Sequence, residues 1–433
     1  MKKPSAPLTE RRYIVAFVLV TSLFFLWALG VNLNDILIPH LKKTFRLTDL
    51  QSSLIQSAFF GGYFLAALPA GWLMERVGYK KGILLGLLTC AVGAFLFIPA
   101  ASIGFYWFFL FALFVMACGQ GVLEVAANPY VTILGPPESS ERRLNLAQSF
   151  NAVGAVVTPI IGGAFILSGI EHSAGQIAAM TREQSIAYSA LEASRVRGTY
   201  LAITALFLVV AVLLYFTRLP EIREGSGDAV QEREKPPRKH WEVWRYTHLV
   251  KGVIAQFFYV GAQVGVTSFV IRFTQHLLPG TPERVAANFL KWHLIGFMIG
   301  RFAGSAMMKR IAPPRLLGFF AVCAFLCTWT AIAGSGAVSV WALVLLGFFD
   351  SIMFPTIFAL SVKDLGVYTK VGSALLVMSI IGGALVPALM GYISDTSSIQ
   401  KAFVVPLICY AYVIYFALRG YKPVVATAAG ERH

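Results

Sequence analysis

"RLPEIREGSGDAVQEREKPPRKHWEVWRYT", residues 218–247, is the longest polar stretch in a chain that otherwise alternates between apolar segments and short loops. Its charges and its Gly, Ser and Pro residues are typical of a linker. The chain has 433 residues, of which 57% are hydrophobic and 13% are charged, whereas soluble domains carry about 25% charged residues. We therefore predict an integral membrane protein in which this linker joins an N-terminal half, residues 1–217, to a C-terminal half, residues 248–433.

The apolar segments on both sides of the linker have the length of membrane-spanning helices, which need about 20 apolar residues. The first of them is too long for a signal peptide and is followed by many more. We predict an all-α membrane protein with twelve transmembrane helices in two six-helix halves. The expected spans are 13–38, 50–74, 82–101, 104–133, 145–169, 198–217, 248–275, 286–308, 315–334, 338–362, 371–394 and 401–419.

The distribution of Lys and Arg between these spans predicts the orientation. If the N-terminus is cytoplasmic, the cytoplasmic segments hold 24 of these residues and the opposite side holds 8. Short loops rich in Lys and Arg stay in the cytoplasm. We therefore expect both termini to be cytoplasmic, which agrees with an even number of spans.

A weak internal repeat supports the division into halves. "NAVGAVVTPIIGG" at 151–163 resembles "IIGGALVPALMG" at 380–391 with an offset of 229, and Pro129 and Pro355 are 226 residues apart. Two repeated halves with a site between them at mid-membrane are typical of a secondary transporter.

Composition and motifs argue against several other classes of protein. The net charge of +15 comes from short basic clusters between spans, so we expect no nucleic-acid partner. The chain has no G-x-x-x-x-G-K-[ST] phosphate-binding loop, and its seven His and five Cys lack the spacing of metal ligands. We expect no enzyme activity, no metal and no cofactor.

Three acidic residues lie inside predicted spans, where a charge costs several kcal/mol and usually marks a functional site. They are Asp35, Glu124 and Asp350, out of 21 Asp and Glu in the chain. Asp350 has two interpretations: a carboxyl group satisfied by local hydrogen bonds, or an extra group that binds a proton, a cation or sugar. Of the basic residues inside predicted spans, Arg301 in the eighth is the one that could face the central cavity and join Asp350 in an extra site, although it lies nearer the end of its span.

Polar residues accompany the acids at a spacing of three or four, so each pair shares one face of its helix. The pairs are Asn32 with Asp35, Glu124 with Asn128, Gln148 with Asn151, and Tyr259 with Gln263. One interpretation is hydrogen bonding between packed helices. The other is a cavity whose groups donate and accept hydrogen bonds, which suits the hydroxyls of a neutral sugar. Four such pairs beside two acids favour a sugar site.

"GWLMERVGYKK" at 71–81, after the predicted second span, resembles the gating-loop motif of the major facilitator superfamily. The residues that carry this resemblance are Gly71, Glu75, Arg76, Gly78 and Lys80, with Glu75 in place of the usual aspartate. Basic residues at a helix end would explain the charges alone, but not the spacing of the glycines. A looser counterpart, "GRFAGSAMMKRIAPPR", occupies residues 300–315.

Longer segments resemble the fucose–proton symporter family of that superfamily. They include "SLFFLWALGVNLNDILIP", "LEVAANPYVTILGP", "RLNLAQSFNAVGA", "YVGAQVGVTSFVIRF" and "FPTIFALSVKDLG", in order over most spans. The resemblance implies that Asp35 and Glu124 serve proton coupling and sugar recognition. It also places Asn32, Gln148 and Asn151 around the sugar. "SIMFPTIF" at 351–358 instead resembles the glucose/galactose branch of the family, which leaves the identity of the sugar open.

The resemblance implies a secondary active transporter of the bacterial inner membrane that imports a neutral monosaccharide, L-fucose or a related hexose, with protons. Protonation would remove an uncompensated buried charge and let the loaded carrier turn over by alternating access. Two alternatives stay open at this point. One is a sodium-coupled symporter of glucose, galactose, mannose or N-acetylglucosamine, and the other is a sugar sensor that does not transport. We expect the protein to be a monomer, because two packed halves in one chain are sufficient for such a transporter.

Overall fold

The structure, a computed structural model, describes residues 6–44, 49–103, 105–165, 181–217, 219 and 240–423. For some residues inside the helices, Asp35 among them, only the backbone is described. All elements in these ranges are helices, as the apolar segments predict. Most of the expected linker lies outside the described residues.

Five long helices make up the first part of the chain, which we call the first helix group. They are α1 (Ile14–Thr44), α2 (Asp49–Ile103), α3 (Tyr106–Ile133), α4 (Ser140–Phe165) and α6 (Arg182–Phe216). Gly78 interrupts α2 with φ 82° and ψ 171°, a backbone conformation that glycine adopts without strain. The predicted spans 50–74 and 82–101 are therefore the two parts of one bent helix.

The second helix group follows the linker. Its helices are α7 (Thr247–Leu277), α8 (Glu283–Met307), α9 (Pro313–Ala333), α10 (Gly336–Asp350), α11 (Met353–Val362), α12 (Thr369–Met378), α13 (Gly382–Thr396), α14 (Ile399–Ala402) and α15 (Val404–Tyr415). Short helical turns join or extend them, namely η4 (His240–Arg245), η5 (Gly366–Tyr368), η6 (Ser379–Ile381) and the π-helix η7 (Phe416–Gly420). The predicted spans 338–362, 371–394 and 401–419 thus each consist of more than one helix.

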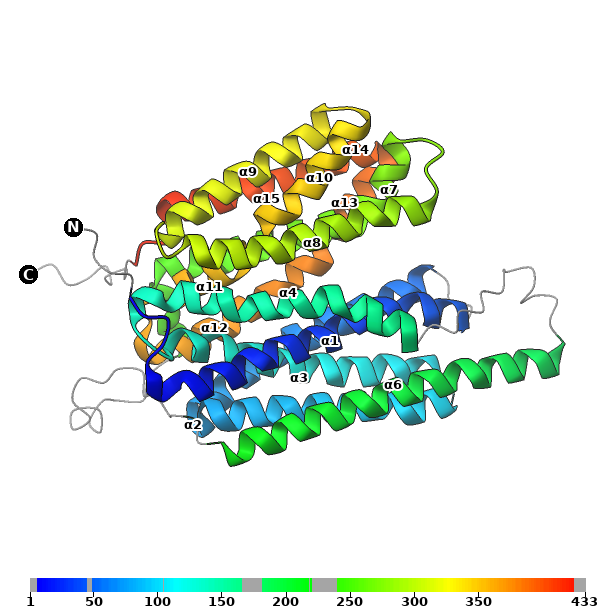
Figure 1. Cartoon of the computed structure of the whole chain (residues 1–433), viewed down its shortest axis with the longest axis horizontal. Coiled ribbons are helices and arrows are strands. Elements are labelled where there is room, and N and C mark those ends of the chain that lie inside the picture. Colours follow the sequence, from blue (N-terminus) through cyan, green and yellow to red (C-terminus); the bar gives the residue numbers. More distant parts are fainter. Residues whose placement is uncertain are drawn as a thin grey trace, which may run out of the picture.

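The helices lie nearly parallel to one another (Figure 1). α1, α2, α3 and α6 form one side of the molecule, and α7, α8, α9, α10 and α15 form the other. The two groups contact each other mainly through α4 with α8 and α11, and through α2 and α3 with α12.

The surface of the bundle is apolar. Large side chains such as Leu88, Val212, Trp329 and Leu418 are exposed, an arrangement that is unfavourable in water and suits contact with lipid chains. Nine segments in the described part of the chain are long and apolar enough to cross a membrane. The chain is a multi-pass membrane protein.

α6 begins much earlier than the span 198–217 that hydropathy predicts. The Thr181 hydroxyl accepts a hydrogen bond from the Gln184 N–H at 3.3 Å, and the Gln184 side chain accepts one from the Thr181 N–H at 3.1 Å. This capping box starts the helix at Arg182, in a polar segment that an apolar-window criterion passes over. The first turns of α6 extend beyond the neighbouring helices in Figure 1. The predicted span 198–217 matches the apolar part of this helix, Arg197–Phe216, and the helix itself continues from it toward the N-terminus.

The segment before α1 is bonded to the loop between α3 and α4. The Thr9 hydroxyl donates to the C-cap carbonyl of α3 at 2.6 Å, and the Ser139 hydroxyl donates to the Pro7 carbonyl at 2.9 Å. Nη1 of Arg143, a fully buried residue of α4, donates to the Leu8 carbonyl at 3.0 Å. These bonds fix the N-terminal segment to the end of the bundle at which α4 begins.

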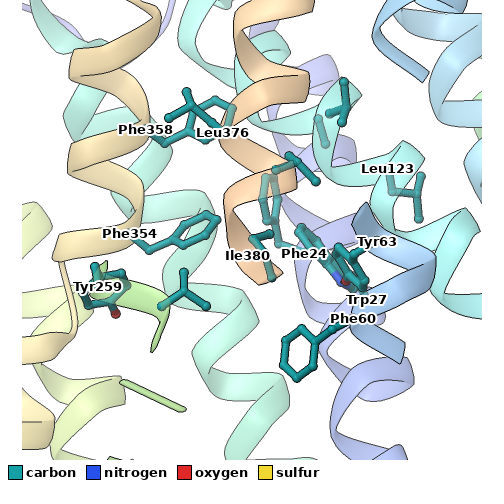
Figure 2. Close-up of a cluster of buried hydrophobic side chains, with 14 of the residues drawn as sticks. Phe24, Trp27, Phe60, Tyr63, Leu123, Tyr259, Phe354, Phe358, Leu376 and Ile380 are labelled. Carbon is teal, nitrogen blue, oxygen red and sulfur yellow. The ribbon is translucent and has the colours of Figure 1, made fainter. Parts of the chain in front are cut away.

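Apolar side chains from both helix groups meet in the cluster that Figure 2 shows. Phe24 and Trp27 of α1 and Phe60 of α2 belong to the first group, whereas Phe354 of α11 and Ile380 of η6 belong to the second. All five side chains are buried. The helix groups are therefore packed together by an apolar core as well as by the polar contacts described next.

Candidate functional site

One face of α3 is polar although the helix is buried. Gln120, Glu124 and Asn128 are spaced by four residues, so they lie on the same face, and each is at most 3% exposed. An isolated buried carboxylate is far more costly than a neutral carboxyl group. The neighbours of Glu124 therefore determine what its carboxyl group can do.

Hydrogen bonds connect Glu124 through Asn128 to a residue of α4. Nδ2 of Asn128 donates to Oε1 of Glu124 at 3.5 Å, which is long for a hydrogen bond. Nε2 of Gln148, a buried residue of α4, donates to Oδ1 of Asn128 at 3.0 Å. The structure thus brings three of the predicted sugar-binding residues into one bonded chain.

Arg301 of α8 extends this chain into the second helix group. Its Nη1 donates to Oε1 of Gln148 at 3.0 Å and also to the Gln148 carbonyl, and its Nε donates to the Ser351 carbonyl at 3.1 Å. The guanidinium carbon lies 4.6 Å from the centroid of the Phe297 ring, a cation–π distance. Arg301 is buried. Three neutral hydrogen-bond acceptors and the Phe297 ring stabilise its charge there.

The Ser351 carbonyl is available to Arg301 because the helix is interrupted there. α10 ends at Asp350 and α11 begins at Met353. In an uninterrupted helix this carbonyl would accept the N–H four residues later, but Pro355 has none. The sequence therefore leaves an acceptor free at the position that Arg301 reaches.

The side chain of Tyr259 in α7 bonds to the same interruption, at the residue before Ser351. Its hydroxyl donates to the Asp350 carbonyl at 2.9 Å. In a regular helix this carbonyl would accept the Phe354 N–H, and an inserted side chain is a known cause of a helix break. In this arrangement the Tyr259 hydroxyl is occupied by backbone, so it positions the α10–α11 junction.

Asp350 is fully buried at the end of α10. Its Oδ2 accepts a hydrogen bond from the Tyr410 hydroxyl of α15 at 2.9 Å. Its Oδ1 has no hydrogen-bond partner among the described residues. Local hydrogen bonds therefore satisfy only one of the two side-chain oxygens.

The other predicted site residues lie outside this chain of bonds. Asn32 donates to a carbonyl of its own helix at 2.7 Å, and Asn151 donates to the Phe24 carbonyl at 3.2 Å. Both side chains are half-buried, as is that of Gln263. Asp35 follows Asn32 along α1, but its side chain lies outside the described part of the chain.

Sequence reasoning missed a second set of polar residues next to Glu124. Nε1 of Trp27 donates to the Tyr63 hydroxyl at 2.8 Å, and that hydroxyl lies 3.5 Å from Oε1 of Gln120. Gln120 precedes Glu124 by four residues, so the same helical spacing that selected Asn128 would have found it. Trp27 and Tyr63 give no such signal, because aromatic residues are frequent throughout the spans.

The residues of the predicted gating loop surround the bend of α2. Gly78 makes the bend, and Gly71 lies so close to α12 that a Cβ would be 2.8 Å from the Cβ of Ala374. Nζ of Lys80 donates to a carbonyl near the end of α6 at 2.8 Å. Glu75, like its neighbour Arg76, is exposed. The bend in α2 therefore requires Gly78, and the close approach of α12 requires Gly71.

Polar contacts join the helix groups at the end of the molecule where α4 and α12 begin (Figure 1). Nδ2 of Asn145 in α4 donates to the Thr356 hydroxyl in α11 at 3.0 Å. Nζ of Lys363 lies 3.8 Å from Oε1 of Glu141, and Nζ of Lys370 lies 5.1 Å from the centroid of a tyrosine ring beside the bend of α2. The helix groups are closed against each other at this end.

The site combines amides, hydroxyls and carboxyl groups. Amides and hydroxyls both donate and accept hydrogen bonds, as the hydroxyls of a neutral ligand require. A carboxyl group can also gain or lose a proton without any other covalent change. Within the described residues, no group of three or more His, Cys, Asp or Glu could hold a metal ion.

Comparisons with known proteins agree with this architecture. Residues 20–387 match the family model of the Major Facilitator Superfamily. The chain is 44% identical over 419 residues to the "L-fucose-proton symporter" of Escherichia coli (strain K12), covering 94% of this chain and 93% of that protein. It is 42% identical over 415 residues to the "Glucose/galactose transporter" of Brucella abortus biovar 1 (strain 9-941), covering 96% of each.

A solved structure is similar over nearly the whole chain. It is the crystal structure of FucP, a major facilitator superfamily transporter in the outward conformation, with a TM-score of 0.87 and 42% identity. The match covers 96% of this chain and 100% of that one. The chain described here therefore belongs to the major facilitator superfamily.

Proposed function

We propose that the chain is a secondary active transporter of the bacterial inner membrane that imports a neutral monosaccharide together with protons by alternating access. The observation that carries this proposal is a buried carboxyl group, Glu124, joined through Asn128 and Gln148 to Arg301 on the opposite helix group. The names of similar proteins support it, since one is an L-fucose–proton symporter and another a glucose/galactose transporter. L-fucose or a related hexose is the expected cargo.

We infer twelve membrane-spanning helices with both termini in the cytoplasm. Nine apolar segments are long enough to span in the described part of the chain. The bend at Gly78 divides one of them into two spans, and α4 and α8, which pack within the same bundle, supply the remaining two. The excess of Lys and Arg on one side supports the orientation. Residues 218–247 then separate six helices in residues 1–217 from six in residues 248–433.

We assign proton coupling to Glu124 and Asp35. Leaving a buried charge without a partner is strongly unfavourable. Protonation of Glu124 when sugar is bound removes that charge and permits the two helix groups to rearrange. Asp35 is assigned on its place in α1, one helical turn after Asn32.

The sugar is held by amide and carboxyl side chains, most of which now bond to one another or to backbone. We assign its hydroxyls to Asn32, Glu124, Asn128, Gln148, Asn151 and Gln263. Each of these side chains has at least one acceptor and, apart from the carboxylate, at least one donor. Tyr259 contributes by positioning the α10–α11 junction.

The contacts between the helix groups support an outward-facing state. The close approach at Gly71 and the bond between Asn145 and Thr356 lie at the inferred cytoplasmic end. The similar FucP structure is in the outward conformation. Alternating access requires these contacts to break when the cytoplasmic side opens.

Uptake into proteoliposomes tests the function. Labelled L-fucose, glucose, galactose, mannose and N-acetylglucosamine are each offered under an inward proton gradient or an inward sodium gradient. We expect one or more of these sugars to accumulate against its own gradient when protons flow inward. Accumulation driven by sodium alone would contradict proton coupling, and binding without accumulation under either gradient would indicate a sensor.

Glu124→Gln separates proton coupling from sugar binding. Glutamine keeps the shape of the side chain but does not titrate, so we expect proton-driven accumulation to be lost while exchange of sugar across the membrane persists. The matched control is Glu283→Gln at an exposed position in the first turn of α8, which should transport normally. Undiminished uphill uptake by the Glu124 variant refutes the assignment.

A further inference from the structure

Asp350 is a second buried acid, and it belongs to the helix group opposite Glu124. It is fully buried, and its Oδ2 has one neutral donor, the Tyr410 hydroxyl at 2.9 Å. Its Oδ1 has no partner among the described residues. A carboxylate in such a place is poorly compensated, whereas a carboxylic acid needs no counter-charge.

The groups that surround Asp350 offer little compensation in this arrangement. The titratable and charged groups packed around it come from four helices, namely Tyr259 of α7, Arg301 of α8, Cys327 of α9 and Tyr410 of α15. Arg301 alone among them is charged at neutral pH, and its bonded N–H groups are directed to Gln148 and to the Ser351 carbonyl. This cation is therefore engaged elsewhere.

Arg301 is bonded to the backbone next to Asp350 and also to the opposite helix group. Its Nε donates to the carbonyl of the residue that follows Asp350, at 3.1 Å. Its Nη1 donates to Gln148 of α4 at 3.0 Å. When α4 and α8 separate, the bond to Gln148 breaks, and the N–H groups of the guanidinium lose that acceptor.

We propose that Asp350 is a second proton-binding site, which holds a proton at Oδ1 while Arg301 bridges to Gln148 and releases it when Arg301 turns to the carboxylate. The proton comes from the outside solution and leaves to the cytoplasm. One O–H bond forms and later breaks, and Arg301 stays charged throughout. The inference rests on the proposed proton-coupled sugar transport and adds about one proton per sugar to it.

Asp350→Asn tests this inference in proteoliposomes. The proton-to-sugar ratio is measured from the membrane potential at which coupled flux reverses. We expect the ratio to fall by about one relative to the unmodified protein, with sugar exchange retained. The matched control is Asp395→Asn at an exposed position of α13, which should keep the ratio. A variant at Asp350 with the unmodified ratio overturns the inference.

Tyr410→Phe supplies a second test that keeps the acid and does not depend on folding of the asparagine variant. It removes the hydroxyl that stabilises the carboxylate, so the proton is held more tightly. We expect the curve of uptake against external pH to move toward alkaline pH by about one unit. Tyr415→Phe, at an exposed position of the same helix, should leave the curve in place.

An unmoved curve for the Tyr410 variant contradicts a role for Asp350 in proton binding. Failure of the unmodified protein to couple sugar to protons would instead contradict the proposed function. The two failures are therefore distinguishable.

Discussion

Gln148 of α4 and Arg301 of α8 are hydrogen-bonded at 3.0 Å across the interface between the two helix groups. The same Gln148 bonds to Asn128, and through it to Glu124. A residue proposed to contact sugar thus also holds the helix groups together. We therefore expect binding of cargo and closure of the interface to be coupled through this shared side chain.

Arg301→Lys should weaken sugar binding. Lysine keeps the charge but loses the planar fork that donates in two directions at once. Loss of one charge-assisted hydrogen bond corresponds to an affinity reduced about tenfold or more, measured as sugar binding to the purified protein. Arg272→Lys is the control, because Arg272 is exposed at the far end of α7. Unchanged affinity in the Arg301 variant would show that the bridge does not support the site.

Gly71→Ala should prevent full closure of the inferred cytoplasmic end. The added methyl would meet the Cβ of Ala374 at 2.8 Å and the Lys370 carbonyl at 3.2 Å. Gly61→Ala in the same helix is the matched control, since nothing lies within 4 Å of its added Cβ. Replacing glycine by alanine stabilises a helix by about 1 kcal/mol at either site. A loss of transport that occurs only in the Gly71 variant is therefore caused by the clash.

The measurement for the glycine pair is the distance between spin labels on α2 and α12 at the inferred cytoplasmic end. We expect a longer mean distance and a several-fold lower uptake rate for the Gly71 variant alone. Equal behaviour of the two variants would mean that this contact does not limit closure.

Glu141 and Lys363 should act as a charge pair across the interface. Their charged atoms are 3.8 Å apart, with Glu141 buried and Lys363 partly exposed. Glu141→Lys places like charges together and should lower uptake, and the double exchange with Lys363→Glu should restore part of it. The difference should shrink at high salt because screening acts on the exposed partner. If the exchange restores nothing, the two residues do not interact during transport.

Arg143→Lys should lower thermal stability without a specific effect on coupling. Arg143 is fully buried and donates to the Val131 carbonyl at 2.9 Å, the Leu8 carbonyl at 3.0 Å and the Ser139 hydroxyl at 2.7 Å. Lysine cannot satisfy these acceptors together. We expect a loss of about 3 kcal/mol, seen as a lower unfolding temperature of the purified protein. Arg142→Lys, at the half-buried neighbouring position, should have little effect.

The sequence predicts the helical class and the approximate place of most spans, because an apolar segment in lipid must satisfy its own backbone by forming a helix. Helical spacing also selects Glu124 with Asn128, which the structure places on one buried face. The start of α6 escapes this reasoning because a capping box within a polar segment sets it. An apolar window measures lipid contact and not helix initiation.

Contacts between distant segments could not be predicted from local patterns. Pro355 indicates a weakened helix, but its effect depends on Tyr259, whose hydroxyl comes from another helix and bonds to the Asp350 carbonyl. The partners of Arg301 are likewise separated from it by 153 and 50 residues. Spacing along one helix carries no information about which helix will pack opposite it.

The bonds of the N-terminal segment have a consequence for biogenesis. Leu8 and Arg143 are 135 residues apart, so the ribosome releases the first partner long before the second exists. The carbonyls of Pro7 and Leu8 must stay hydrated until α4 has been synthesised. This segment therefore docks only after α4 has been synthesised, and a bulky group attached to it would act on that docking step.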